Sequence, residues 1–129
     1  MPPELVPAEP AQILIVEDNE VNALILRSML RKHGYEPVVA VDGRQGVEMS
    51  GRYRPRLVLM DLQMPHLDGF AAAAEIRRNA GPDAPVFVAV TANDGSDMLS
   101  ACRAAGFASV LAKPVVFDSL IATVRRYLG

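Results

Sequence analysis

Four short apolar runs in this chain each lead directly into residues that carry reactive chemistry. The runs are rich in valine, isoleucine and leucine, which is typical of buried parallel strands. They cover residues 12–16, 56–60, 86–90 and 109–112, and they are followed by Glu17 with Asp18, by Asp61, by Thr91 and by Lys113. In open parallel sheets, ligands bind outside the carboxyl ends of the strands. We therefore expect three carboxylates, a hydroxyl and an ammonium to converge on one site.

Amphipathic stretches with helix boundary signals lie between these runs. Asp68 is placed to cap one helix, and Gly34 and Gly106 are placed to end two others. The helices are predicted at residues 19–33, 43–53, 69–80, 94–105 and 117–128, and a further strand at 37–41. Five strands thus alternate with five helices along the chain.

Strict alternation predicts an α/β, doubly wound fold: a five-stranded parallel sheet with right-handed crossovers and helices on both faces. The second strand ends only in Asp42-Gly43, a turn signal without chemistry. A flavodoxin-like order of 2-1-3-4-5 puts that strand at an edge and the crevice between the first and third strands. The rival dinucleotide-binding fold lacks its glycine fingerprint, because Val16 is followed by Glu17-Asp18-Asn19.

Composition limits the partners and the compartment. The 129 residues fit one domain, and the net charge of −2 gives no basic footprint for direct binding of nucleic acid. No apolar stretch approaches the roughly 20 residues of a membrane span, so membrane insertion is not expected. Cys102 is the single cysteine, which excludes an internal disulfide and favours the cytoplasm. Residues 1–11 are proline-rich and are predicted to be a disordered lead-in or linker before a domain at 12–129.

The acidic residues at the strand ends suggest a metal site. Glu17, Asp18 and Asp61 would repel one another in one crevice unless they share a cation or a proton. Mg²⁺ suits such a site because it binds through one or two carboxylates together with phosphate oxygens and water. The alternative is that Glu17 and Asp18 cap the first helix, where the helix dipole favours negative charge.

Asp61 is the candidate nucleophile. A carboxylate that attacks phosphorus forms an aspartyl phosphate, and a metal ion with Lys113 would offset the negative charge of the phosphoryl group. Thr91 can donate its hydroxyl to a phosphoryl oxygen. Taken singly, Asp61 is also explained as a loop cap, Thr91 as a helix-start residue and Lys113 as a solvated charge. Their joint placement on strand ends favours the site.

Four segments together resemble the receiver domain of two-component response regulators, especially receivers attached to hybrid histidine kinases. They are ILIVEDNEVN at residues 13–22, LMDLQMPHLDG at 59–69, VAVTA at 88–92 and AKP at 112–114. The resemblance covers residues 12–129. It implies that the domain at 12–129 is a receiver.

The resemblance implies that Asp61 accepts phosphate from a phosphohistidine of a histidine kinase or histidine phosphotransfer domain. It also implies that Glu17, Asp18 and Asp61 hold Mg²⁺ together with the backbone carbonyl of Gln63. The output is then a changed surface and changed partner affinity, with slow self-dephosphorylation instead of turnover of a metabolite.

The resemblance further implies that Thr91 and Lys113 bind the phosphoryl group and that the Lys113–Pro114 peptide bond is cis. Phosphorylation adds about −1.5 to −2 of charge and would draw the threonine and its loop inward. One position departs from the family pattern. The aromatic residue that often sits three residues before the lysine is Val110 here. Phe107 is interpreted as a core anchor and not as its replacement.

The first helix is predicted to present a docking patch for the phosphodonor. Its core face is assigned to Ile25, Leu26, Met29 and Leu30. Val21 and Leu24 fall outside that face and are predicted to form a small exposed apolar patch beside the site. We expect a helix bundle that bears the phosphohistidine to dock there.

Two alternative functions remain open from the sequence. One is a phosphatase with an aspartate nucleophile, although the second aspartate common in such enzymes is replaced by Gln63. The other is a degenerate receiver that binds a protein partner independently of phosphate, a possibility that Val110 keeps open. The sequence also leaves the oligomeric state open, with a monomer favoured.

Overall fold

The computed structural model describes residues 11–64 and 67–129, so residues 1–10 of the predicted lead-in lie outside it. The strands are β1 (Ile13–Val16), β2 (Val38–Ala40), β3 (Leu57–Asp61), β4 (Val86–Thr91) and β5 (Ser109–Ala112). The helices are α1 (Glu20–Lys32), α2 (Gly43–Tyr53), α3 (Gly69–Ala80), α4 (Ser96–Ala104) and α5 (Phe117–Leu128), with a short 3₁₀ turn η2 (Gly81–Asp83).

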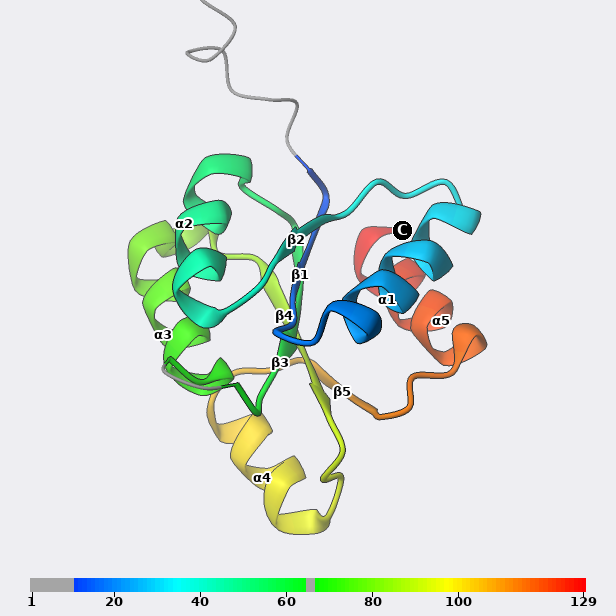
Figure 1. The fold of residues 1–129 in the computed structure, drawn as a ribbon. Helices are drawn as coiled ribbons and strands as arrows, with labels where there is room; N and C mark the ends of the chain where they lie inside the picture. The colour runs from blue at the N-terminus through cyan, green and yellow to red at the C-terminus, as the bar shows by residue number, and fades with distance from the viewer. Residues whose placement is uncertain (1–10, 65–66) are drawn as a thin grey trace, which may run out of the picture.

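The strands form one parallel sheet in the order β2-β1-β3-β4-β5. The predicted doubly wound, flavodoxin-like order is confirmed. Figure 1 shows α1 and α5 on one side of the sheet and α2 and α3 on the other. All five strands therefore run in the same direction and end at the same edge.

Two apolar clusters, one on each face, hold the helices to the sheet. One joins alternate strand residues such as Leu14 and Val58 to Ile76 of α3 and Cys102 of α4. The other contains Leu26 and Leu30 of α1 with Leu120, Ile121 and Val124 of α5. Both faces are covered, which is why these strands are almost continuously apolar.

Phe107 is a core anchor, as predicted from the sequence. It is 6% exposed and meets Phe70 and Phe87 edge-on, with ring centroids 5.8 and 5.9 Å away. Edge-to-face pairs of this kind add to the free energy gained by burial alone. The three rings fix the segment before β5 against α3 and β4.

Helix caps follow the sequence signals, with two corrections. Asp42 and Asp68 accept backbone N–H groups at the starts of α2 and α3. The cap of α1 is Asn19, which accepts the N–H of Asn22, so the alternative of a Glu17-Asp18 cap is wrong. α4 begins at Ser96, not at residue 94, because Gly95 in extended conformation is its N-cap.

Ile25 does not face the core, which corrects the assignment made from its spacing. The buried stripe of α1 is Ala23, Leu26 and Leu30, at positions i, i+3 and i+7. Ile25 is 46% exposed and lies on the outer side with Val21 and Leu24, which are 64% and 61% exposed. The exposed apolar patch on α1 is thus larger than the sequence predicted.

Gly69 allows α3 to start against the backbone that carries the end of β3. A Cβ atom at this position would collide with the carbonyl of Asp61 and lie 2.8 Å from the Cα of Leu62. At Gly51, in α2, an added Cβ would meet nothing within 4 Å. The first glycine is required by close packing, whereas the second is not.

We expect Gly69→Ala to lower the free energy of unfolding by about 1–3 kcal/mol, because the new methyl group forces a backbone shift. Gly51→Ala, the matched control, should raise it by about 0.5–1 kcal/mol through helix propensity. Urea denaturation of both variants measures the difference. Equal effects of the two changes would contradict this account of α3 packing.

Candidate functional site

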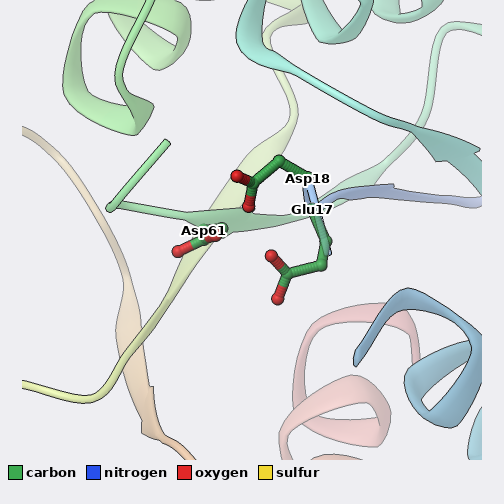
Figure 2. A group of neighbouring side chains, drawn as sticks. All are labelled: Glu17, Asp18 and Asp61. Atoms are coloured by element: carbon green, nitrogen blue, oxygen red, sulfur yellow. The ribbon is translucent and has the colours of Figure 1, made fainter. Parts of the chain in front are cut away.

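Three carboxylates meet where β1 and β3 end. Glu17 and Asp18 follow β1 directly, and Asp61 is the last residue of β3. These strands are parallel neighbours with Val16 opposite Met60, so their next residues come out at the same level. One carboxylate oxygen from each acidic residue lies within 4.8 Å of the others. Figure 2 shows the three side chains gathered around one point.

The three acidic groups differ in their contact with water. Glu17 and Asp61 are each 2% exposed, whereas Asp18 is exposed. Buried carboxylates are costly unless they are paired with a cation or share a proton. The cluster therefore has a closed inner side and an open outer side at Asp18.

Lys113 supplies the nearest positive charge. Its Nζ lies 3.1 Å from Oε1 of Glu17 and 3.3 Å from Oδ1 of Asp61, and its side chain is 23% exposed. The interpretation of this lysine as a solvated surface charge is therefore wrong. One ammonium group therefore bridges two buried carboxylates, and contacts of this kind between charged groups are stronger than neutral hydrogen bonds.

Burial and the crowding of charged groups shift the pKa values of Glu17 and Lys113. Burial, followed by the hydrogen bond and charge of Asp61, raises the pKa of Glu17 to about 7, although Lys113 opposes the rise. Burial lowers the pKa of Lys113, but its hydrogen bonds and the charges of Glu17 and Asp61 more than offset that, so the pKa is raised. One lysine does not balance the acidic cluster, and a further cation would be favoured there.

Asp61 is held through one of its two oxygens. Oδ1 accepts the backbone N–H of Gln63 at 3.0 Å and also lies beside Lys113. Both contacts use Oδ1, which leaves Oδ2 as the oxygen that they do not engage. The contacts with Gln63 and Lys113 thus orient the carboxylate through Oδ1.

Thr91 is the last residue of β4 and is fully buried. Its hydroxyl oxygen accepts the N–H of Asn93 at 3.1 Å, which leaves the hydroxyl proton to be donated elsewhere. Its carbonyl accepts the N–H of Lys113 at 2.9 Å across the β4–β5 edge. The Lys113–Pro114 bond that follows is cis. Thr91 and Lys113 are therefore neighbours through the main chain.

A hollow of about 300 Å³ adjoins the carboxylates and was not evident from the sequence. It lies between α1 and the segment after β5, and its walls include Glu17, Lys113, Ile25 and Val115. One sequence signal could have indicated this hollow: Ile25 lies next to Val21 and Leu24 on the helix and is a third apolar residue near the site. The hollow joins the carboxylate cluster to the apolar patch on α1.

Val110 lies in β5, one strand position after Ser109. It is partly buried and packs against the cluster that contains Phe107. Phe107 lies in the core, so its ring is not the counterpart of the aromatic residue expected at position 110 from the sequence.

The model of the response regulator receiver domain family matches residues 13–125. The chain belongs to this family. Among the solved structures similar to this receiver is that of a Pseudomonas aeruginosa sensor histidine kinase receiver domain, with a magnesium ion coordinated in its active site cleft. It is 37% identical, with a TM-score of 0.83 and coverage of 95% of this chain and 99% of that one.

Another similar structure is the receiver domain of the yeast response regulator Ssk1, co-crystallised with the histidine phosphotransfer signalling protein Ypd1 from Saccharomyces cerevisiae. It is 30% identical, with a TM-score of 0.84 and coverage of 93% of this chain and 90% of that one. These likenesses identify a receiver domain of two-component signalling.

Curated relatives include both single receivers and long kinases. Protein PilH of Pseudomonas aeruginosa is 35% identical, and the match covers 92% of this chain and 98% of PilH. The peroxide stress-activated histidine kinase mak1 of Schizosaccharomyces pombe is 39% identical over 84% of this chain, which spans 7% of mak1. Within the described residues, every helix is too short or too polar to cross a membrane.

The pKa of Glu17 predicts a pH-dependent stability in metal-free protein. The folded state keeps its proton up to a pKa of about 7, whereas the ordinary value is 4.5. The resulting contribution to the free energy of unfolding is complete below about pH 4.5 and is lost as the pH rises through 7. We expect Glu17→Gln to lose less stability across this range in urea denaturation with EDTA. Superimposable pH profiles for the two proteins would contradict the raised pKa.

Proposed function

We propose that this receiver is a phosphoacceptor that takes a phosphoryl group from a phosphohistidine onto Asp61, with Mg²⁺ bound beside it. The observation that carries the proposal is the convergence of Asp61 with Glu17, Asp18 and Lys113 at the ends of β1, β3 and β5. Phosphoryl transfer depends mainly on positioning and on neutralising charge. The cluster is arranged to provide both.

In the proposed step, Oδ2 of Asp61 attacks the phosphorus atom. The new P–O bond forms as the P–N bond to the donor histidine breaks, and the imidazole leaves with the bonding electron pair and takes up a proton. Lys113 would offset charge on the phosphoryl oxygens, and the hydroxyl of Thr91 would donate to one of them. Gln63 orients the attacking carboxylate through its N–H.

The acidic cluster suits a hard divalent cation. Glu17, Asp18 and Asp61 offer oxygen ligands within 4.8 Å of one another, and Mg²⁺ prefers such ligands. We assign the backbone carbonyl of Gln63 as a further ligand. The ion would supply positive charge to the carboxylates and to the incoming phosphate. The magnesium ion in the similar Pseudomonas aeruginosa receiver supports this assignment.

The phosphodonor is proposed to dock on the apolar patch of α1, formed by Val21, Leu24 and Ile25. These side chains are exposed, and Ile25 also lines the hollow that contains Glu17 and Lys113. Exposed apolar patches beside a site often mark a protein interface. The partner is a histidine kinase or a histidine phosphotransfer domain. The complex of the yeast receiver with Ypd1 supports this class of partner.

The proposed output is a change of surface at the end of β4. A phosphoryl group on Asp61 would draw the Thr91 hydroxyl inward and move the loop before α4. The small side chain of Val110 cannot change its position as an aromatic ring there could, so this movement would rely on the backbone of β4 and β5. The alternative that Val110 keeps open is a module that binds its partner independently of phosphate.

Incubation with acetyl phosphate and Mg²⁺ should give a labile phosphoryl adduct detected by intact-protein mass spectrometry. Asp61→Asn should lose the adduct, because the amide is a poor nucleophile, and EDTA should suppress it in the wild-type protein. An adduct that persists in Asp61→Asn would contradict the assignment. No adduct on the wild-type protein would favour the phosphate-independent module, and rapid turnover of small phosphoesters would favour a phosphatase.

Leu24→Asp should slow transfer from a phosphorylated histidine phosphotransfer domain by about tenfold or more, because it places a charge in the proposed interface. Labelling by acetyl phosphate should be unchanged, since that donor needs no docking surface. Leu99→Asp on α4 is the matched control, because Leu99 is also an exposed leucine. Equal transfer rates for the two variants would show that α1 is not the docking surface.

A further inference from the structure

A second hollow, of about 640 Å³, lies at the other end of the sheet from the carboxylate cluster. Its walls include Arg56, just before β3, and Val86, at the start of β4, whereas Asp61 and Thr91 end these same strands. The last turns of α2 and α3 form its sides. The volume falls in the range of about 300–1,000 Å³ that is usual for small-molecule sites.

The walls of this hollow combine apolar and polar surface. Val47 of α2, Ile76 of α3 and Val86 of β4 provide the apolar part, and Pro55 and Pro85 also line the hollow. Gly51 also lines it, and a side chain there would project into open space. The hollow therefore has apolar wall residues that an apolar group of a ligand can contact, and open space beside Gly51.

Two arginines give the hollow its charge. Arg54 and Arg56 both line it, and neither has a carboxylate within 4.0 Å in the part of the chain that the structure describes. Asp83 is the one acidic residue among the lining residues. The balance at the hollow is thus one net positive charge, which matches an anionic ligand.

Arg54 adopts a backbone conformation that its residue type does not favour. It is the C-cap of α2, with φ 49° and ψ 59°, in the left-handed region. It is the one non-glycine residue with positive φ among residues 11–64 and 67–129. Glycine usually fills such positions, and another residue is strained there. Strain of this kind is concentrated at functional sites.

We propose that this hollow binds a small organic anion, a phosphate ester or carboxylate carried on an apolar or aromatic body. Arg54 and Arg56 line the hollow, and arginine guanidinium groups can bind either anion through paired hydrogen bonds. The apolar body packs on Val47, Ile76 and Val86. The carbonyl ends of α2 and α3 repel anions, so recognition depends on the two arginines. This site is separate from the phosphoacceptor proposed at Asp61.

Titration of ¹⁵N-labelled protein with phenyl phosphate, followed by amide NMR shifts, tests the proposal. We expect saturable shifts at residues 50–56 and 79–86, with weaker binding of inorganic phosphate and no binding of benzyl alcohol. Shifts confined to the neighbourhood of Lys113 would overturn the proposal, as would equal binding of benzyl alcohol or no shifts at millimolar phenyl phosphate.

Arg54→Gly separates binding from folding. Glycine relieves the left-handed strain and keeps the bond from the residue-54 N–H to Ser50, so the variant should unfold at the same temperature or higher. We expect it to bind phenyl phosphate about tenfold more weakly. Arg78→Gln, an exposed arginine of α3 outside the lining, is the control and should bind as wild type. Unchanged affinity in Arg54→Gly would overturn the proposal.

Gly51→Leu tests the apolar part of the same hollow. Leucine suits the helix, and the space beside residue 51 is open, so folding should be retained. The new side chain should compete with the apolar body and weaken binding of phenyl phosphate more than binding of inorganic phosphate. Equal weakening for the two probes, or none, would contradict the assigned position of the body.

Discussion

The arrangement of this receiver depends on one ionic contact, in which the Lys113 ammonium bridges two nearly inaccessible carboxylates. Glu17 comes directly after β1, Asp61 is the last residue of β3, and Lys113 comes directly after β5. Two buried anions so close together are unfavourable without a counter-charge. The sheet register brings the groups together, and the lysine makes their proximity tolerable. Burial, together with the nearby Asp61, still raises the pKa of Glu17 to about 7.

Much of the fold was predictable because its signals are local and agree with one another. Apolar runs indicated the strands, Asp68 indicated the start of one helix, and the alternation of elements indicated the parallel order. The positions of the strand ends followed from that order alone. The proximity of the carboxylates and Lys113 was therefore accessible before any coordinates, although the contacts between individual oxygens were not.

The features that could not be predicted from the sequence depend on how each helix is rotated against the sheet and on where hollows form between elements. Ile25 fits helical spacing as well as Leu26 does, and only the packing of α1 on the sheet decides which one is buried. Asn19 took the capping role because its side chain reaches the N–H of Asn22, a choice between adjacent acceptors that composition does not make. The hollow near Arg54 arises where two helices end, and no motif marks it.

The backbone bond from the Lys113 N–H to the Thr91 carbonyl has a consequence for how a signal leaves the pocket. This hydrogen bond couples the carboxyl ends of β4 and β5 through the main chain, whatever side chains lie nearby. A displacement of Thr91 would therefore also displace Lys113. If phosphorylation displaces Thr91 as proposed, the displacement would reach β5 through this hydrogen bond, in which the side chain of Val110 takes no part.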